Sequence, residues 1–142
     1  MNRPPLPRVV LFACVHNAGR SKMAAAWLNH LADPKKARAI SAGTQPAERA
    51  HPIVVEAMRE VGIDVGNEPP QLLTAELAAQ VDLLITMGCG DACPVVPGLR
   101  RDDWPLPDPK GQPIERVREI RDQIRAHVED LLAQADRTRE SA

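Results

Sequence analysis

Two short, mainly apolar runs constrain the fold of this chain more than any other feature. RVVLFA occupies residues 8–13 and VDLLITM occupies residues 81–87. Apolar runs of this length that lack polar alternation are typical of strands buried on both faces, which occur in parallel sheets covered by helices. The sequence therefore predicts an α/β fold built around a parallel sheet.

The segments around these runs complete the pattern. A weaker strand is predicted at 38–43 and a short edge strand around 101–106. Apolar residues spaced three to four apart predict helices at 21–32, 52–61, 74–80 and from 114 to about 133. Strands alternating with helices indicate a single three-layer α/β domain over residues 1–142, with a small, mostly parallel four-stranded sheet flanked by helices.

Charge and length exclude several classes of function. The chain has 142 residues and a formal net charge of -1, so nothing predicts a nucleic-acid partner. No apolar run reaches the roughly 20 residues of a membrane span, and residues 1–8 lack the apolar core of a secretory signal. With only 3 cysteines, a disulfide scaffold is not expected. We expect a cytoplasmic monomer without a membrane partner.

The segment CVHNAGRS, residues 14–21, follows the first apolar run and precedes a predicted helix. A loop in this position presents unpaired backbone N–H groups in a small arc, which is a site for an anion. Ala18 and Gly19 let the main chain curl closely around a tetrahedral oxyanion, and Arg20 can add two fixed donors. The loop therefore predicts a phosphate-like oxyanion as ligand.

Cys14 begins the same segment, where the loop dipoles would stabilise its thiolate and make it a nucleophile. The alternative is a small buried hydrophobic residue at the end of a strand, which is the commoner role of a single cysteine. The pattern C-x5-R-S is not specific alone. Its position between a buried strand and a helix favours catalysis.

This arrangement resembles the low molecular weight protein tyrosine phosphatase superfamily, whose signature is a strand, C-x5-R-[ST] and a helix near the N-terminus. The resemblance continues with SAG at 41–43 and with Asp108-Pro109. It implies that Asp108 is the general acid, that Asn17 braces the loop and that Ser21 stabilises the Cys14 thiolate. It also implies an oxyanion site formed by Val15, His16, Asn17, Ala18, Gly19, Arg20 and Ser21.

Cys89 and Cys93 follow the second apolar run, in the Gly-rich segment GCGDAC. As metal ligands they lack a second pair, so no metal or cofactor is predicted. The carboxyl ends of parallel strands meet at one edge of a sheet. We therefore expect Cys89 and Cys93 at the same edge of the sheet as Cys14. Three thiols at one edge suggest a thiol relay.

The three thiols resemble those of the arsenate reductases that share the phosphatase fold. The resemblance implies reduction of arsenate to arsenite, for arsenic detoxification, with Cys14 as nucleophile and Cys89 and Cys93 as resolving cysteines. Asp108 would protonate the departing oxygen, and a Cys89-Cys93 disulfide would form. Thioredoxin or a low molecular weight thiol would then reduce that disulfide.

Departures from the phosphatase pattern help to distinguish an arsenate reductase from a phosphatase. Gly19 stands where phosphatases of this fold commonly carry a second cysteine, and Lys110-Gly111 follow Asp108-Pro109 where aromatic residues are common. Both argue against a phosphotyrosine substrate. Ala25 replaces an acidic residue that helps to hold potassium in related reductases. A phosphatase hydrolysing phosphomonoesters and a non-catalytic oxyanion sensor remain alternatives.

The remaining histidines and tryptophans have structural interpretations. We expect His30, His51 and His127 at the surface or in helix packing, and Trp27 in the core. Trp104 lies in the Pro-rich segment that leads to Asp108 and is expected to anchor it.

Overall fold

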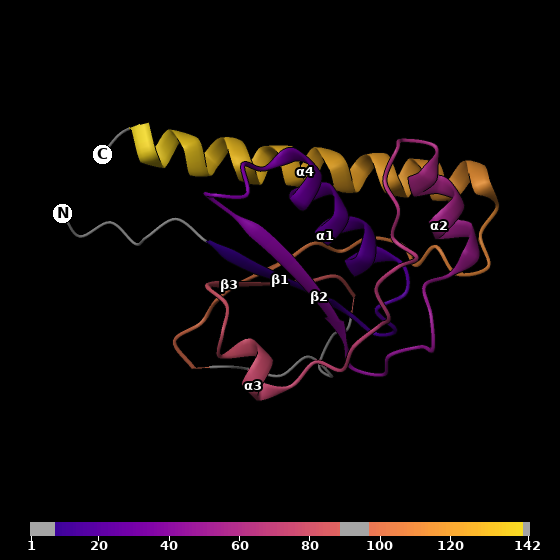
Figure 1. Ribbon diagram of the computed structural model, residues 1–142, viewed down its shortest axis with the longest axis horizontal. Helices are drawn as coiled ribbons and strands as arrows, with labels where there is room; N and C mark the ends of the chain where they lie inside the picture. The colour runs from indigo at the N-terminus through magenta and orange to yellow at the C-terminus, as the bar shows by residue number, and fades with distance from the viewer. Residues whose placement is uncertain (1–7, 89–96, 141–142) are drawn as a thin grey trace.

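The computed structural model describes residues 8–88 and 97–140, with residues 135–140 described by their main chain only. Its elements, labelled in Figure 1, are β1 (Val9–Cys14), α1 (Arg20–Leu31), β2 (Arg38–Gly43), α2 (Pro52–Arg59), α3 (Ala75–Ala78), β3 (Leu83–Thr86), β4 (Arg100–Asp103) and α4 (Ile114–Glu140). The predicted alternation of strands and helices is confirmed, and the edge strand lies slightly earlier than expected. None of the helices in the described ranges has the length and apolar character needed to cross a bilayer.

The four strands form one parallel sheet in the order β2-β1-β3-β4. The predicted fold class is therefore confirmed. Cys14 pairs with Gly43 on one side of β1, and Ala13 pairs with Thr86 on the other. This register brings the carboxyl ends of the three strands to the same edge, where ligands of such sheets bind.

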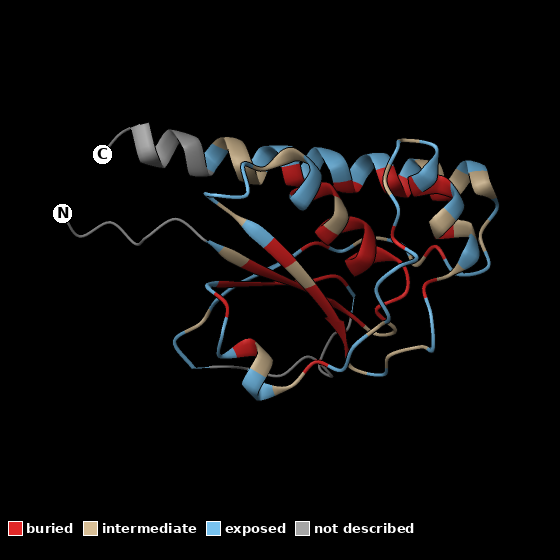
Figure 2. Cartoon of the chain, viewed as in Figure 1, coloured by how far each residue is buried: buried red, intermediate tan, exposed pale blue. Residues whose placement is uncertain are grey.

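Helices cover the two faces of the sheet unequally (Figure 1). Val10 and Phe12 of β1 belong to the larger core, which includes buried residues of α1, α2 and α4. Leu11 and Ala13 point the other way, into a smaller core that includes α3. Successive side chains of a strand alternate between faces, so Figure 2 shows β1 buried along most of its length.

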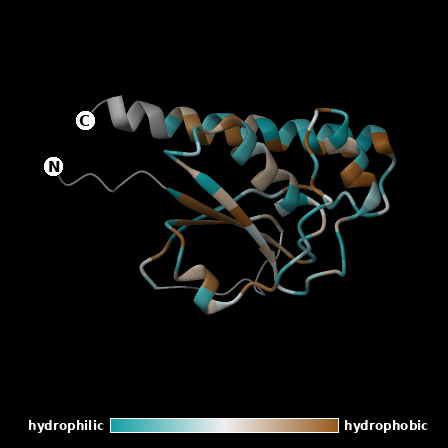
Figure 3. Ribbon diagram, viewed as in Figure 1, coloured by the Kyte–Doolittle hydropathy of each residue, from teal (hydrophilic) through white to brown (hydrophobic). Residues whose placement is uncertain are grey.

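Helix α4 packs its apolar stripe on the larger core and turns charged residues outward, as the mixed colours of Figure 3 show. Val117, Ile120, Ile124 and Val128 are each 0% exposed. The helix continues to Glu140, beyond the predicted end near residue 133. The sequence that follows the stripe is polar but contains no Pro or Gly, so hydrogen bonding along the main chain continues past the last apolar contact.

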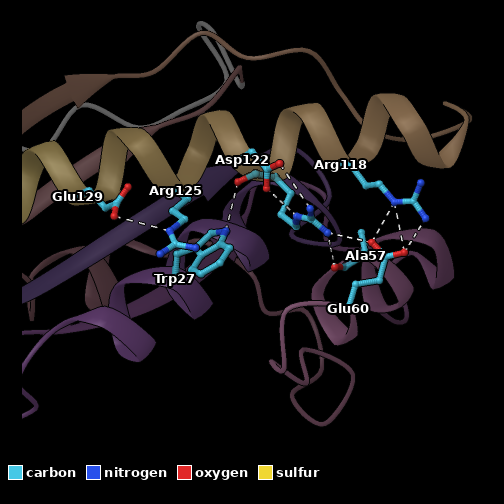
Figure 4. Close-up of polar contacts among 8 residues, drawn as sticks. Trp27, Ala57, Glu60, Arg118, Asp122, Arg125 and Glu129 are labelled. Atoms are coloured by element: carbon cyan, nitrogen blue, oxygen red, sulfur yellow. Dashed lines mark hydrogen bonds and ion pairs between the residues drawn. The ribbon is translucent and has the colours of Figure 1, made fainter.

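Polar contacts fasten α4 to α2 and α1 (Figure 4). The Glu60 carboxylate accepts hydrogen bonds from Arg118 Nη2 at 2.7 Å and from Arg121 Nη1 at 2.9 Å. Hydrogen bonds from Arg118, and then from Arg121, lower the pKa of Glu60 to about 2. On α1, Trp27 Nε1 donates to Arg121 O at 3.2 Å, and the Arg125 guanidinium lies 4.9 Å from the centre of the Trp27 ring. Trp27 is a core residue, as predicted.

Candidate active site

The predicted anion loop, residues 14–21, connects the end of β1 with the first turn of α1. Cys14 is the last residue of β1 and is 2% exposed. Helix α1 begins at Arg20, and Gly19 before it provides no side-chain cap. The N–H groups of the first turn are consequently available to a ligand held by the loop.

The carbonyl groups of this loop bind the segment that follows β2. Cys14 O accepts from Thr44 N at 3.2 Å, Val15 O from Gln45 N at 2.8 Å, His16 O from Ala47 N at 2.9 Å and Ala18 O from His51 N at 2.9 Å. The N–H groups of residues 15–19 have no acceptor in the part of the chain that the structure describes. We call this loop, residues 14–21, the cradle. Its unpaired N–H groups are suited to a tetrahedral oxyanion.

Gly43 at the end of β2 allows the cradle to approach the sheet. A β-carbon at this position would lie 2.6 Å from Val15 O and 2.8 Å from Asn17 N. Both neighbours are main-chain atoms, which cannot turn away as a flexible side chain could. The glycine of the SAG segment is thus required by close packing between β2 and the cradle.

A chain of hydrogen bonds ends at the Cys14 sulfur. Gln71 N donates to Asn17 Oδ1 at 2.9 Å, and Asn17 Nδ2 donates to Ser21 Oγ at 2.8 Å. Ser21 Oγ lies 2.9 Å from Cys14 Sγ. Since the serine oxygen already accepts from Asn17, its hydroxyl hydrogen is free to point at the sulfur. A donor in this position is the kind of contact that a thiolate accepts, and Asn17 and Ser21 lie where the predicted roles require them.

Arg20 links the cradle to the segment that carries Asp108. Arg20 is 8% exposed, and its Nη1 donates to Leu106 O at 3.1 Å. Its Nη2 lies 3.7 Å from Asp108 Oδ2, and the Asp108 side chain is 43% exposed. Residues far apart in sequence therefore meet at the cradle, and the carboxyl group can reach both the site and water.

Pro109 covers Gly19. A β-carbon on Gly19 would lie 2.7 Å from Pro109 Cγ, so a larger residue would displace the proline. Lys110 N donates to Asp108 Oδ1 at 3.0 Å, which closes a local turn around the carboxylate. The absence of a side chain at position 19 lets the Asp108-Pro109 segment rest on the cradle.

His51 lies at the N-terminus of α2, in keeping with the predicted surface or helix-packing role, and it also contacts the cradle. Its backbone N–H donates to Ala18 O, and its ring lies beside Gly19 and Pro109. Burial lowers the pKa of His51, the Asp108 carboxylate opposes that shift, and His16 and Lys110 reinforce it. Nothing in the local sequence indicates that residue 51 also returns to the loop.

Trp104 is buried, as expected of an anchor for the segment leading to Asp108. Its ring lies 5.4 Å from the Phe12 ring and stacks on His127 at 4.9 Å. His127 therefore has the helix-packing role that was predicted. His30 is exposed and packs its ring edge against Trp27.

Cys89 and Cys93, the predicted resolving cysteines, lie outside the described residues. Gly88, which precedes Cys89, has a positive φ of 96°. A β-carbon on Gly88 would collide with the Arg20 guanidinium, so the main chain here passes directly beside the arginine. The end of β3 thus leads the chain to the side of the cradle.

Within the described ranges, no group of three or more His, Cys, Asp or Glu residues is arranged to hold a metal ion. Ala25 is buried in α1. It supplies no carboxylate to the cavity of about 380 Å³ that it lines together with Lys22 and Ser41.

Comparisons with known proteins agree with this geometry. The sequence model described as low molecular weight phosphotyrosine protein phosphatase matches residues 9–141. An arsenate reductase of Staphylococcus haemolyticus is 32% identical over 128 residues, which cover 87% of this chain and 95% of that protein. Among solved structures, a thioredoxin-dependent arsenate reductase of Corynebacterium glutamicum has a TM-score of 0.80 and 38% identity.

That alignment covers 92% of this chain but only 63% of the Corynebacterium chain, which is therefore considerably longer. A second solved structure, an arsenate reductase in the phosphate binding state, has a TM-score of 0.77 and 32% identity and matches 90% of this chain and 98% of its own.

Proposed function

Since the chain belongs to the low molecular weight phosphotyrosine protein phosphatase family, we propose that it is an arsenate reductase, which converts arsenate to arsenite in arsenic detoxification. The observation that carries the proposal is the buried Cys14 sulfur at the base of the cradle, within 2.9 Å of Ser21 Oγ. Similarity to arsenate reductases at 32% and 38% identity supports this choice of substrate.

The first step is attack by Cys14. The N–H groups of residues 15–19 and the Arg20 guanidinium hold the arsenate oxygens, which brings arsenic to the thiolate. A sulfur–arsenic bond forms and an arsenic–oxygen bond breaks. Asp108 donates a proton to the departing oxygen, which leaves as water or hydroxide. The position of the Asp108 carboxyl beside Arg20 supports this role.

The second step transfers two electrons. Cys89 attacks the Cys14 sulfur, a sulfur–sulfur bond forms, and the electron pair of the sulfur–arsenic bond passes to arsenic, which leaves as arsenite. Cys93 then attacks Cys89, which releases the Cys14 thiolate and leaves a Cys89-Cys93 disulfide. Because β3 leads to Gly88 beside Arg20, the described part of the chain supports this assignment.

The reductant is a dithiol protein of the thioredoxin type. The similarity to a thioredoxin-dependent enzyme supports it, and a disulfide between two cysteines close in sequence is the kind of substrate that a protein dithiol reduces. A low molecular weight thiol acting through a mixed disulfide is the competing reductant. We further propose that the protein acts as a monomer in the reducing cytoplasm, where its thiols persist.

Phosphomonoester hydrolysis is the second candidate function, because the cradle and Asp108 would serve it equally well. Its chemistry requires neither Cys89 nor Cys93. Lys110, next to the Asp-Pro pair, is exposed and offers no aromatic surface for a tyrosine ring. This observation favours the small inorganic oxyanion over an aryl ester.

The decisive experiment compares the parent protein with Cys89→Ser, Cys93→Ser and Cys14→Ser. With thioredoxin, thioredoxin reductase and NADPH, we expect multiple-turnover arsenate reduction only in the parent. Cys89→Ser should still bind phosphate, because the cradle is intact. Full turnover by Cys89→Ser would contradict the relay. Hydrolysis of phosphotyrosine peptides without arsenite formation by the parent would identify a phosphatase instead.

A further inference from the structure

Lys22 is the most deeply buried lysine that the structure describes, and it lies in the first turn of α1. It is 5% exposed, and its ammonium group donates to Glu68 O at 2.9 Å and to Pro69 O at 3.3 Å. A lysine is rarely buried to this extent without compensation. Here the compensation comes from main-chain carbonyl groups of a short segment that has no helical or strand hydrogen bonding of its own.

The environment of the ammonium group shows that its burial has a cost. Burial lowers the pKa of Lys22, and the Glu68 carboxylate opposes that shift. A methionine of similar length would fill the same space without desolvating a charge. Compared with such a methionine, Lys22 contributes only its hydrogen bonds to the two carbonyl groups.

The segment that Lys22 holds also supports the cradle. Two residues beyond Pro69, Gln71 N donates to Asn17 Oδ1 at 2.9 Å. The side chain of Gln71 donates to Ser41 O at 2.9 Å, and its carbonyl accepts from Gly43 N at 2.9 Å. Pro69 and Pro70 have fixed φ angles and no N–H group, so a shift of the carbonyls that Lys22 binds is passed on to Gln71.

Asn17 connects Gln71 to the surroundings of Cys14. Because its Oδ1 accepts from Gln71, its Nδ2 faces Ser21 Oγ, to which it donates at 2.8 Å. Ser21 then directs its hydroxyl at Cys14 Sγ. If the Gln71 N–H moved away, only the hydrogen bond to Ser21 Oγ would be left to orient the amide of Asn17.

We propose that Lys22 is a positioning residue for Cys14, which fixes residues 68–71 and thereby the orientation of Asn17 and Ser21 around the thiolate. Lys22 touches no reacting atom in this role. The inference rests on the proposed function only in taking Cys14 as the nucleophile, and it holds for arsenate reduction and for phosphoester hydrolysis alike.

The test measures the reactivity of Cys14 directly. Cys89→Ser and Cys93→Ser are combined, so that Cys14 is the sole remaining thiol of the 3 in the chain. Its rate of alkylation by iodoacetamide is followed from pH 5 to 9 in this background and with Lys22→Met added. We expect alkylation at neutral pH to slow about fivefold, the effect of losing one ordinary hydrogen bond to the thiolate. Affinity for phosphate should change by less than about twofold, because the contacts of the cradle with residues 44–51 remain.

Asn29→Ala provides the matched control. Asn29 also lies on α1, and its side-chain amide bonds the main chain of β2 through Ala39 N at 2.8 Å and Ala39 O at 3.0 Å. Its loss should lower thermal stability without changing the alkylation rate. Slower alkylation in Lys22→Met but not in Asn29→Ala separates positioning from general loosening of the fold.

One result of the alkylation experiment would overturn the proposal. A folded Lys22→Met variant that alkylates at the rate of its background would exclude the role of Lys22. If Lys22→Met does not fold, Lys22→Leu, which likewise has no donor for the two carbonyls, is measured in its place under the same criterion. Alkylation requires no arsenate, so a failure of arsenate turnover in the parent would contradict the proposed function alone.

Discussion

The Asp108 carboxylate lies 3.7 Å from the Arg20 guanidinium, at the cradle that Arg20 helps to form. The same guanidinium donates to Leu106 O at 3.1 Å. In the proposed mechanism, an oxyanion entering the cradle would share Arg20 with the segment that carries Asp108. Binding and proton transfer would then meet at one side chain.

Asp108→Asn should separate these two steps. We expect the single-turnover rate of arsenate reduction to fall about 10²-fold or more, since a positioned general acid contributes roughly that much. Phosphate should bind at least as well as in the parent, because a negative charge beside Arg20 has been removed. Rapid-quench measurement of arsenite and phosphate titration by calorimetry give the two quantities. An unchanged rate would contradict the role of Asp108 as the general acid.

Gly19→Ala tests whether Pro109 must rest on the cradle. The new β-carbon would lie 2.7 Å from Pro109 Cγ, so the Asp108-Pro109 segment must move. A displacement of this size should lower kcat about tenfold. The affinity for phosphate, which depends on the main chain of the cradle, should change little.

Gly66→Ala is the control for this substitution. A β-carbon on Gly66 would meet neighbours no closer than 3.4 Å, so activity should stay near that of the parent. Equal losses of kcat in Gly19→Ala and Gly66→Ala would mean that the contact with Pro109 has no special role.

Glu60→Gln should change how stability depends on pH. Because the arginines lower the pKa of Glu60 from 4.5 to about 2, the carboxylate stabilises the fold fully above the unfolded value and loses this effect as pH falls through about 2. Thermal melts should show a Tm below that of the parent from pH 5 upward, and this difference should disappear near pH 2. Glu129→Gln, on α4, controls for the change in net charge. A Tm difference that is independent of pH would contradict the assignment.

Local sequence patterns were sufficient to predict the strands and the helix that carry the site. The runs at 8–13 and 81–87 are mainly apolar, without alternation, because each of the two strands β1 and β3 packs into a core on both faces of the sheet. The position of Cys14 between β1 and α1 follows from the strand–loop–helix order alone. The family resemblance also pointed to Asn17 and Ser21; in the structure Ser21 Oγ lies 2.9 Å from the Cys14 sulfur, and Asn17 Nδ2 donates to Ser21 Oγ.

The tertiary contacts of the site could not be predicted from local sequence patterns. His51 reaches the cradle through a main-chain hydrogen bond to Ala18 that carries no sequence signature. Pro69-Pro70 is typical of a loop, and nothing in these residues shows that the main chain around them binds Lys22 and Asn17. Long-range pairing of main-chain groups depends on the fold and not on the identity of the residues that contribute them.

The hydrogen bonds from residues 44–51 to the carbonyl groups of the cradle have a consequence for the thermodynamics of anion binding. Since residues 44–51 already fix the loop through hydrogen bonds of 2.8 to 3.2 Å, its conformational entropy is lost when the chain folds and not when the anion arrives. Binding then requires dehydration of the anion and reorientation of Arg20, with little rearrangement of the main chain. A small hydrated oxyanion, which offers few contacts to offset an ordering cost, is the kind of ligand that gains most from a site prepared in this way.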